Sequence, residues 1–264
     1  MSDKNLLILG IAGIIAIMVL SYVLFPGAKR FVDEDSNGLN IANQVGTSDK
    51  ILTTENQEII KETPIYTENI SYPKIVNMQD INAQEKTNKA IEDFVLERVA
   101  NFEEQIMSED VFEDFQDYLQ IQYLVTLLNE SLVSISFSAS ENFGGAHPNN
   151  YAITFNYDIT GAKKVELWDI FKKGVDYKGV ISEICQEKLL VQFGEDEALE
   201  SWIKEGTEPK EGSFENFVLT NASLVISFNP YEVGPYAIGI QTVEIFFTDI
   251  EQYLDTQGLL VDLI

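Results

Sequence analysis

The sequence is poor in the residues from which metal and redox sites are most often built. Its 264 residues include one Cys and one His. An intramolecular disulfide, a Cys-based zinc site and a metal site with two His ligands are therefore excluded. Cys185 falls on the apolar side of an expected helix and has no cation nearby in the sequence to lower its pKa. We expect a buried, inert thiol there, and no cofactor.

Cations are also scarce, with 17 Lys and Arg against 43 Asp and Glu, a net charge of −26. A protein that neutralises nucleic-acid phosphates needs a basic face, so nucleic acid is excluded as a partner. Docking onto anionic lipid headgroups is disfavoured for the same reason. A basic protein partner, such as a cationic lytic enzyme, would be steered toward this chain. General solubility explains the same charge without a partner, so both interpretations stay open.

Signatures of catalysis are missing as well. The sequence contains no G-x-S-x-G motif, no phosphate-binding loop and no dinucleotide fingerprint, and one His cannot form H-E-x-x-H. A glycosidase requires only two carboxylates at a suitable separation, and 43 acidic residues neither exclude nor locate such a pair. We predict a protein without catalytic residues, with a carboxylate-pair enzyme as the alternative.

The N-terminus carries the one long apolar run. Residues 6–25 contain no charged side chain, and twenty helical residues span the roughly 30 Å hydrocarbon layer. A cleaved signal peptide has a shorter apolar region of about 7–15 residues, and Pro26 stands where a small residue is wanted. We therefore predict a retained single-pass helix from Leu6 to Phe25. Residues 1–5 form a short cytoplasmic tail in this prediction, and the rest of the chain lies outside the cell.

Residues 26–62 are polar, without sustained periodicity, and are predicted to form a linker. Within them, Asp33 to Gly38 fits the first six positions of a calcium loop. The twelfth position should be a bidentate Glu and is Gln44. Whether Asp33 to Gln44 binds calcium stays open, because a solvated linker explains the same residues.

The remaining chain is predicted to fold as α+β, with antiparallel sheets and packed helices in two subdomains, 63–160 and 161–264. Asp80 is a plausible N-cap of a long helix, and Asn129 to Ser131 joins two strands as a hairpin. In the second strand, apolar residues alternate with serines, so one face should be buried and the other exposed to solvent. Elements follow one another without a βαβ rhythm, which favours antiparallel pairing. The apolar face of the long helix comprises Ile81, Ile91, Phe94, Val95, Val99 and Phe102, and that of the strand comprises Val133, Ile135, Phe137 and Ala139.

Two unusual loops are the candidate ligand site. Gly144 and Gly145 permit positive φ or a close backbone approach, and the lone His147 follows them. In the run from Phe228 to Ala237, two prolines and a glycine lie among aromatic residues. Its Tyr231 and Tyr236 could stack on a sugar, grip a peptide or cap the core. The predicted ligand-binding residues are Gly144, Gly145, His147, Tyr231 and Tyr236, and structurally demanding turns are the alternative interpretation.

These loops carry a family resemblance. The runs GGAHPNNYAITFNYDITGAKKVELWDIF (Gly144–Phe171) and FVLTNASLVISFNPYEVGPYAIGIQTVEI (Phe217–Ile245), with Ile81-Asn82, resemble the RsiV/PdaC-type extracytoplasmic family. This paired domain of unknown function occurs in the ectodomain of a lysozyme-sensing anti-sigma factor and ahead of peptidoglycan deacetylase domains. The resemblance covers roughly residues 62–250 and implies an α+β fold in two subdomains.

The resemblance also implies a function. We expect a membrane-anchored, bacterial extracytoplasmic module that binds or senses a peptidoglycan fragment or a wall-active, lysozyme-like basic protein. Anti-sigma factors of this family carry a sigma-binding segment before the membrane helix, for which residues 1–5 are too short. The deacetylase domains use one Asp and two His, which a single His excludes. A structural envelope protein is a further alternative, and no binding residue is transferred from the family.

Overall fold

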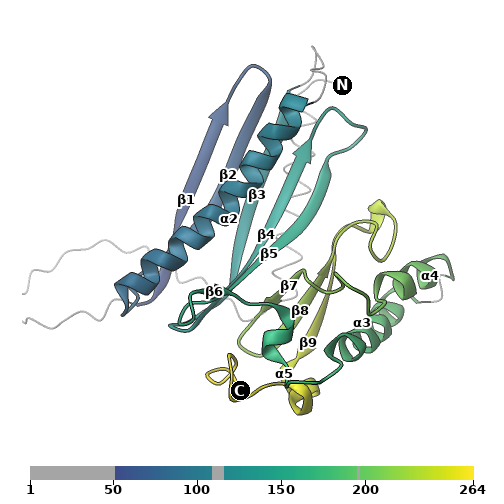
Figure 1. Cartoon of the computed structure of the whole chain (residues 1–264). Helices are drawn as coiled ribbons and strands as arrows, with labels where there is room; N and C mark the ends of the chain where they lie inside the picture. Colours follow the sequence, from purple (N-terminus) through teal and green to yellow (C-terminus); the bar gives the residue numbers. More distant parts are fainter. Residues whose placement is uncertain (1–50, 109–115, 195–196) are drawn as a thin grey trace, which may run out of the picture. The chain divides into compact units, whose positions relative to one another are not determined.

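The computed structural model describes residues 51–108, 116–194 and 197–264, which contain two β-sheets (Figure 1). The larger sheet has six strands in the order β1-β2-β3-β4-β5-β6, and the smaller has the order β7-β8-β9. The strands of the larger sheet are β1 (Thr53–Glu62), β2 (Tyr66–Val76), β3 (Asp117–Leu128), β4 (Leu132–Asn142), β5 (Asn149–Asp158) and β6 (Lys163–Lys164). Those of the smaller sheet are β7 (Phe217–Leu219), β8 (Ser223–Phe228) and β9 (Gln241–Phe246).

Four α-helices accompany the sheets in the part of the chain that the structure describes. They are α2 (Ile81–Ser108), α3 (Tyr177–Phe193), α4 (Glu197–Gly206) and α5 (Phe247–Ile250), and short 3₁₀ turns lie at Leu167–Ile170, Tyr236–Ile238 and Glu251–Tyr253. No described helix has both the length and the apolar character needed to cross a membrane. The span predicted for residues 6–25 and the calcium loop predicted at Asp33 to Gln44 lie outside the described residues.

The α+β class is confirmed, but one pair of strands departs from the expected antiparallel arrangement. Strands β2 and β3 are parallel, with Ile70 opposite Ile121, and α2 connects them. All other neighbouring strands are antiparallel. Parallel neighbours need a crossover connection, which α2 provides. The sequence order therefore hides one βαβ unit in an otherwise antiparallel-rich fold.

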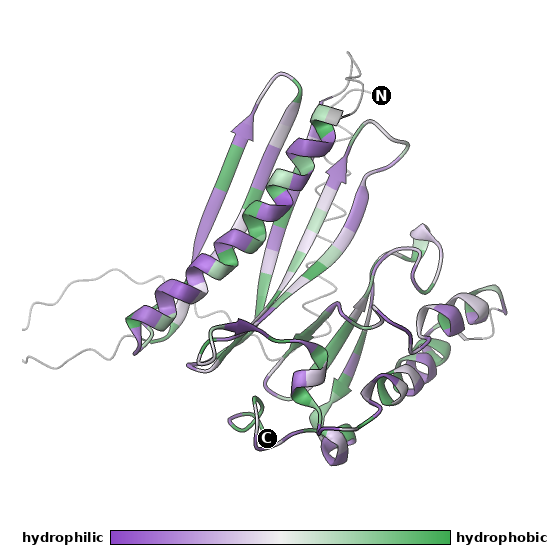
Figure 2. Cartoon of the chain, viewed as in Figure 1, coloured by the Kyte–Doolittle hydropathy of each residue, from purple (hydrophilic) through white to green (hydrophobic). Residues whose placement is uncertain are grey.

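Helix α2 begins where the sequence indicates. The carboxylate of Asp80 accepts a hydrogen bond from the Ala83 N–H at 3.0 Å, as an N-cap does. Polar and apolar residues alternate along α2 (Figure 2), and its apolar stripe packs on the larger sheet. The prediction for Ile81 was wrong, since it is 56% exposed in the first turn, ahead of the buried stretch that begins at Thr87. The buried members of the stripe are Ile91, Val95, Val99 and Phe102.

The larger sheet begins and ends outside the predicted subdomain 63–160. Residues 53–62, assigned to the linker from their sequence, form β1, which pairs with β2 along its whole length. Only Ile59 of this strand packs against the core, so its side chains carry little periodic signal. Backbone pairing with β2 orders the segment regardless of side-chain type. At the other end, β6 at Lys163–Lys164 extends the sheet beyond residue 160.

The β3–β4 hairpin is confirmed, but one serine that was expected to face solvent is buried. The side-chain oxygen of Asn129 accepts hydrogen bonds from the N–H groups of Ser131 and Leu132, which closes the turn. Ser136 and Ser138 are partly exposed, as expected, but Ser134 is fully buried. The four alternating apolar residues of β4, Val133, Ile135, Phe137 and Ala139, are all buried.

Ser134 is buried because the smaller sheet covers it. Its hydroxyl donates to Asn156 on β5 at 2.5 Å and accepts from the Leu219 N–H on β7 at 2.8 Å. The Asn156 amide in turn donates to the Phe217 carbonyl at 2.7 Å. Each of these buried polar groups thus has a partner, and the bonds to Leu219 and Phe217 fasten β7 to the larger sheet.

A second core lies between α3 and the smaller sheet. It includes Ile181, Cys185 and Leu189 of α3 together with Leu224 and Ile226 of β8. Cys185 is fully buried, as predicted, and burial raises the pKa of its thiol to about 12. The thiol therefore stays protonated and unreactive in the folded protein.

Candidate functional site

The two loops singled out in the sequence meet in the structure. The rings of His147, in the β4–β5 loop, and Tyr236, in the β8–β9 loop, stack with centroids 4.0 Å apart and planes inclined by 23°. The Tyr231 ring lies 5.9 Å from that of Tyr236. We call these three residues the aromatic cluster. The structure thus brings together the predicted residues His147, Tyr231 and Tyr236.

Hydrogen bonds from Tyr236 hold the two loops together. Its hydroxyl donates to the carbonyl of Pro148 at 2.7 Å and accepts from the Asn150 side-chain amide at 2.8 Å. Nδ1 of His147 lies 3.0 Å from the same Pro148 carbonyl. Tyr236 therefore links the two loops, and its ring stacks on that of His147 and lies near that of Tyr231.

Asn229 attaches the second loop to the edge of β5. Its side chain accepts from the Ala152 N–H at 2.7 Å and donates to the Ala152 carbonyl at 3.2 Å. The amide of Asn216 also donates to that carbonyl, at 3.0 Å. Strand β6 pairs only with Tyr157 and Asp158. At Ala152 the edge of β5 is therefore completed by amide side chains that act like backbone groups.

Tyr231 combines exposure with an unfavourable backbone conformation. Its φ of 73° lies in the left-handed region, which costs a non-glycine residue about 1–2 kcal/mol. The Tyr231 N–H donates to the Gly234 carbonyl at 3.0 Å, which fixes this tight turn. The side chain is 55% exposed. Strained residues that present a side chain to solvent cluster at functional sites.

The two glycines of the first loop differ in what they contribute. Gly144 has a φ of 81°, and its N–H donates to the Asn142 side chain at 3.0 Å. A side chain there would be strained, as the sequence indicated. Gly145 has open space around it, since a Cβ there would meet only the His147 carbonyl oxygen, at 3.8 Å. Both glycines are exposed beside His147.

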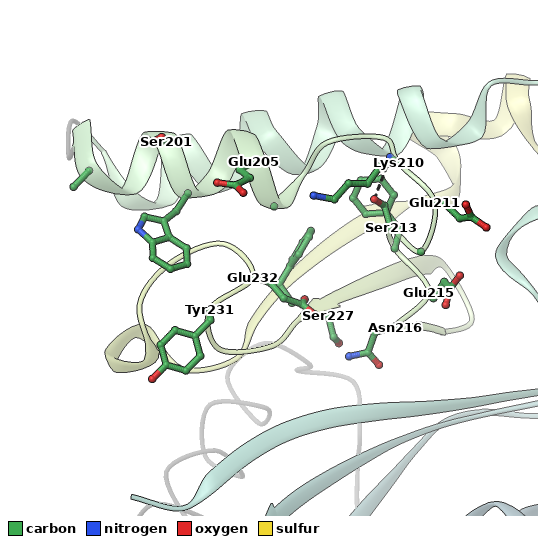
Figure 3. A pocket seen from close by; sticks show the side chains of 16 residues that line it. Ser201, Glu205, Lys210, Glu211, Ser213, Glu215, Asn216, Ser227, Tyr231 and Glu232 are labelled. Carbon is green, nitrogen blue, oxygen red and sulfur yellow. Dashed lines mark hydrogen bonds between the residues drawn. The ribbon is translucent and has the colours of Figure 1, made fainter. Parts of the chain in front are cut away.

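A groove of about 700 Å³ has Tyr231 in its lining (Figure 3). Glu205 and Lys210 lie across it from Tyr231 and Glu232. Trp202 of α4, 39% exposed, adds a second accessible aromatic ring to its lining. The remaining lining residues include Ser201, Glu211, Ser213, Phe214, Glu215, Asn216, Ser227 and Phe228. The groove therefore combines aromatic rings with several carboxylates and one ammonium group.

Glu232 and Gly206 position the loop that carries Tyr231. The Glu232 carboxylate accepts from the Asn229 N–H at 2.8 Å. Burial raises the pKa of this carboxyl, and the hydrogen bond from Asn229 partly offsets the rise. A Cβ at Gly206, the last residue of α4, would lie 2.0 Å from the Glu232 carbonyl oxygen. Only glycine allows this approach of helix and loop backbones.

Sequence reasoning did not identify Asn150, Asn216, Asn229 or Gly206 as site residues. Asn229 precedes Pro230 at the end of a strand, a position typical of a turn, and its bond to β5 depends on the tertiary fold. Within the described ranges, no group of three or more His, Cys, Asp or Glu side chains is arranged to hold a metal ion.

Comparison with known proteins divides the chain into two matched regions. Residues 59–150 match the family model described as Deacetylase PdaC, and residues 168–248 match that described as Protein of unknown function (DUF3298). His147 and Asn150 fall in the first region, and Tyr231 and Tyr236 in the second. The aromatic cluster thus draws residues from both.

One curated relative is the peptidoglycan-N-acetylmuramic acid deacetylase PdaC of Bacillus subtilis, 27% identical over 225 residues. The match covers 81% of this chain and 46% of that protein. This chain spans less than half the length of the curated relatives it matches.

Two solved structures have the same fold. A DUF3298 family member from Bacteroides fragilis matches with a TM-score of 0.59 and 19% identity, covering 81% of this chain and 98% of that one. A DUF3298 family protein from Pseudomonas aeruginosa also gives 0.59, with 18% identity and coverage of 78% and 96%.

Proposed function

Since this chain belongs to the PdaC/RsiV-type family, with a PdaC region followed by a DUF3298 region, we propose that it binds cell-wall glycan as an extracytoplasmic module. Homology to a peptidoglycan deacetylase supports a role at the cell wall. In this proposal the module is held at the cell membrane by residues 6–25, with its N-terminus in the cytoplasm. It senses or retains wall fragments and performs no catalysis.

The aromatic cluster is the observation that carries this proposal. Tyr231 is 55% exposed and sits beside the stacked pair of Tyr236 and His147. A sugar ring has an apolar C–H face and a hydroxyl-bearing edge, so it packs on aromatic rings and hydrogen-bonds to polar neighbours. The amide of Asn150 donates to the Tyr236 hydroxyl, and Tyr231 shares the lining of the groove with several carboxylates.

A binding role fits these residues better than a catalytic one. His147 is the one histidine of the sequence, and it is engaged with Tyr236 and the Pro148 carbonyl. The Glu232 carboxylate, whose pKa is raised, is used to close its own loop through Asn229. Incubation of the chain with peptidoglycan, followed by mass spectrometry, tests catalysis directly. Release of fragments or of acetate would overturn the non-catalytic role.

A basic wall-active protein, such as a lysozyme, is the second candidate ligand. The net charge of −26 and the groove residues Glu205, Glu211, Glu215 and Glu232 favour it. Lys210 is the one basic residue of that lining. Such an association would weaken as salt rises, because screening reduces attraction between exposed charges.

Binding measurements at two salt concentrations separate the two candidates. We expect the full chain to bind an N-acetylglucosamine hexasaccharide with little salt dependence, since that ligand is uncharged. Tyr231→Ala should weaken binding about tenfold, the loss of roughly 1.4 kcal/mol of packing. Trp168→Ala is the matched control, because Trp168 is an aromatic residue exposed outside the site (56%).

Each outcome has a definite meaning. Binding of hen lysozyme that disappears at high salt, without binding of the hexasaccharide, would replace the glycan by a basic protein. Absence of binding to both probes would overturn the binding function as stated.

A further inference from the structure

The larger sheet has a face that α2 does not cover. Side chains alternate along a strand, and the apolar residues of β2 to β5 point toward α2. On the opposite face, Asn69, Gln120, Ser140 and Asn150 are register partners on four successive strands. With about 4.8 Å between neighbouring strands, this row of amides and a hydroxyl is about 14 Å long.

The neighbouring rows on this face are uncharged on β2 to β5, while on β1 the same face carries Glu62, opposite Thr67, and Glu58, opposite Ser71. We call the amide row and the three neighbouring rows described below, all on β2 to β5, the polar face. Its further rows join β2, β3 and β4 on one side of the amide row, and β3, β4 and β5 on the other. None of these residues is charged, although 23% of the chain is. The rows are Thr67, Tyr118 and Asn142; Gln122, Ser138 and Ala152; and Leu124, Ser136 and Thr154.

Most side chains of the polar face are partly exposed, and Ala152 is buried. Asn69 is exposed, Leu124 is 43% exposed, and Gln120 and Gln122 are partly exposed. Strand β7 covers one end of the face, where Ser134 and Asn156 are buried. The accessible area therefore lies beyond that end.

The amide row leads directly to the aromatic cluster. Asn150, its last member, donates from its side chain to the Tyr236 hydroxyl at 2.8 Å. A ligand that packs on Tyr231 and Tyr236 can therefore continue over Asn150, Ser140 and Gln120 without crossing a charged side chain.

We propose that the polar face binds the extension of an uncharged glycan strand whose end lies on the aromatic cluster. This inference rests on the proposed glycan-binding function and assigns that ligand a second region. Amides and hydroxyls both donate and accept hydrogen bonds, as the hydroxyl and acetamide groups of such a strand require. An anionic polymer would be repelled by a chain of net charge −26, and a basic one finds no carboxylate in these rows on β2 to β5, since Glu58 and Glu62 lie on the neighbouring strand β1.

Chain-length dependence tests the inference. The full chain is titrated with the disaccharide and the hexasaccharide of N-acetylglucosamine, and the hexasaccharide should bind at least about tenfold tighter. The double variant Gln120→Glu, Gln122→Glu should lose about that tenfold and leave disaccharide affinity unchanged. Ser138→Asp provides an independent variant in the second row. Gln257→Glu, an exposed position near the C-terminus, is the matched control for added charge.

The results distinguish this inference from the proposed function. If wild-type chain binds both saccharides equally, or if the variants keep the hexasaccharide affinity, the polar face is not a glycan surface and the aromatic cluster alone binds. If the variants change the oligomeric state in sedimentation without changing affinity, the face is a contact between copies and the inference is wrong. Failure of wild-type chain to bind either saccharide would overturn the glycan-binding function itself.

Discussion

The imidazole ring of His147 lies against the phenol ring of Tyr236, with centroids 4.0 Å apart. His147 belongs to the region that matches the PdaC model, and Tyr236 to the region that matches DUF3298. The aromatic cluster therefore forms only when both regions are folded and docked. Neither matched region alone contains all three residues of the cluster.

Removal of the Tyr236 hydroxyl should loosen the first loop. Tyr236→Phe deletes the bonds to Pro148 and Asn150, each worth about 1 kcal/mol. We expect faster hydrogen exchange at the amides of Gly144 to His147 and weaker saccharide binding. Tyr253→Phe, near the C-terminus, is the control. Unchanged exchange in Tyr236→Phe would show that stacking alone holds the loop.

Because Tyr231 has a strained backbone and an exposed ring, two substitutions there should differ in stability but not in saccharide affinity. At a φ of 73°, glycine avoids the strain that any other residue experiences. Tyr231→Gly should therefore be more stable than Tyr231→Ala by about 1 kcal/mol in urea unfolding, while both lose saccharide affinity equally. Equal stability of the two variants would mean that the turn relaxes, and unequal affinity would mean that the ring is not the binding element.

Gly206 should be intolerant of a side chain. A Cβ there meets the Glu232 carbonyl oxygen at 2.0 Å, so Gly206→Ala must push α4 away from the Tyr231 loop. We expect a loss of about 1–3 kcal/mol in the free energy of unfolding, together with weaker binding. Gly145→Ala, where a Cβ would make only an ordinary contact at 3.8 Å, serves as the steric control for stability. A stable Gly206→Ala variant with full affinity would contradict this account of the loop.

A buried carboxyl under α2 gives the stability a pH dependence. Glu68 is 2% exposed, and Oε1 of its carboxyl has no hydrogen-bond partner. Burial raises the pKa of Glu68, while Lys61, its partner on β1, partly offsets the rise. The folded state therefore holds this proton to higher pH than the unfolded state, and stability falls as pH rises through the folded pKa.

Replacement of this carboxyl should remove that dependence. Glu68→Gln should gain about 1 kcal/mol at pH 7 and little at pH 4, measured by urea unfolding. Glu103→Gln is the opposite control, because the hydrogen bond from Lys61 lowers the pKa of Glu103. That variant should be less stable at pH 7 than wild type. A Glu68→Gln variant destabilised at pH 7 would show that the charged carboxylate is stabilising.

Local features were the ones that sequence could predict. The Asp80 cap, the Asn129 turn, the burial of Cys185 and the conformational role of Gly144 all follow from neighbouring residues. The convergence of the two loops did not follow, since their residues are more than eighty positions apart and nothing local encodes their contact. A family resemblance could place both loops in one protein but could not make them adjacent.

Features that depend on distant partners were missed. Strand β1 is ordered by backbone pairing with β2, which its mostly polar side chains do not reveal. The parallel β2–β3 pair depends on the path of α2. The alternating pattern of β4 predicts that Ser134 faces solvent, but Ser134 is buried because β7 covers it. In each case the deciding interaction comes from a segment remote in sequence.

Glycan binding by the aromatic cluster is tested most directly by a crystal structure of the chain soaked with the N-acetylglucosamine hexasaccharide. We expect a sugar ring packed on Tyr231 beside Tyr236, with the strand continuing over Asn150 toward Gln120. Sugar density confined to another surface, or no density at a concentration that saturates binding in solution, would contradict it.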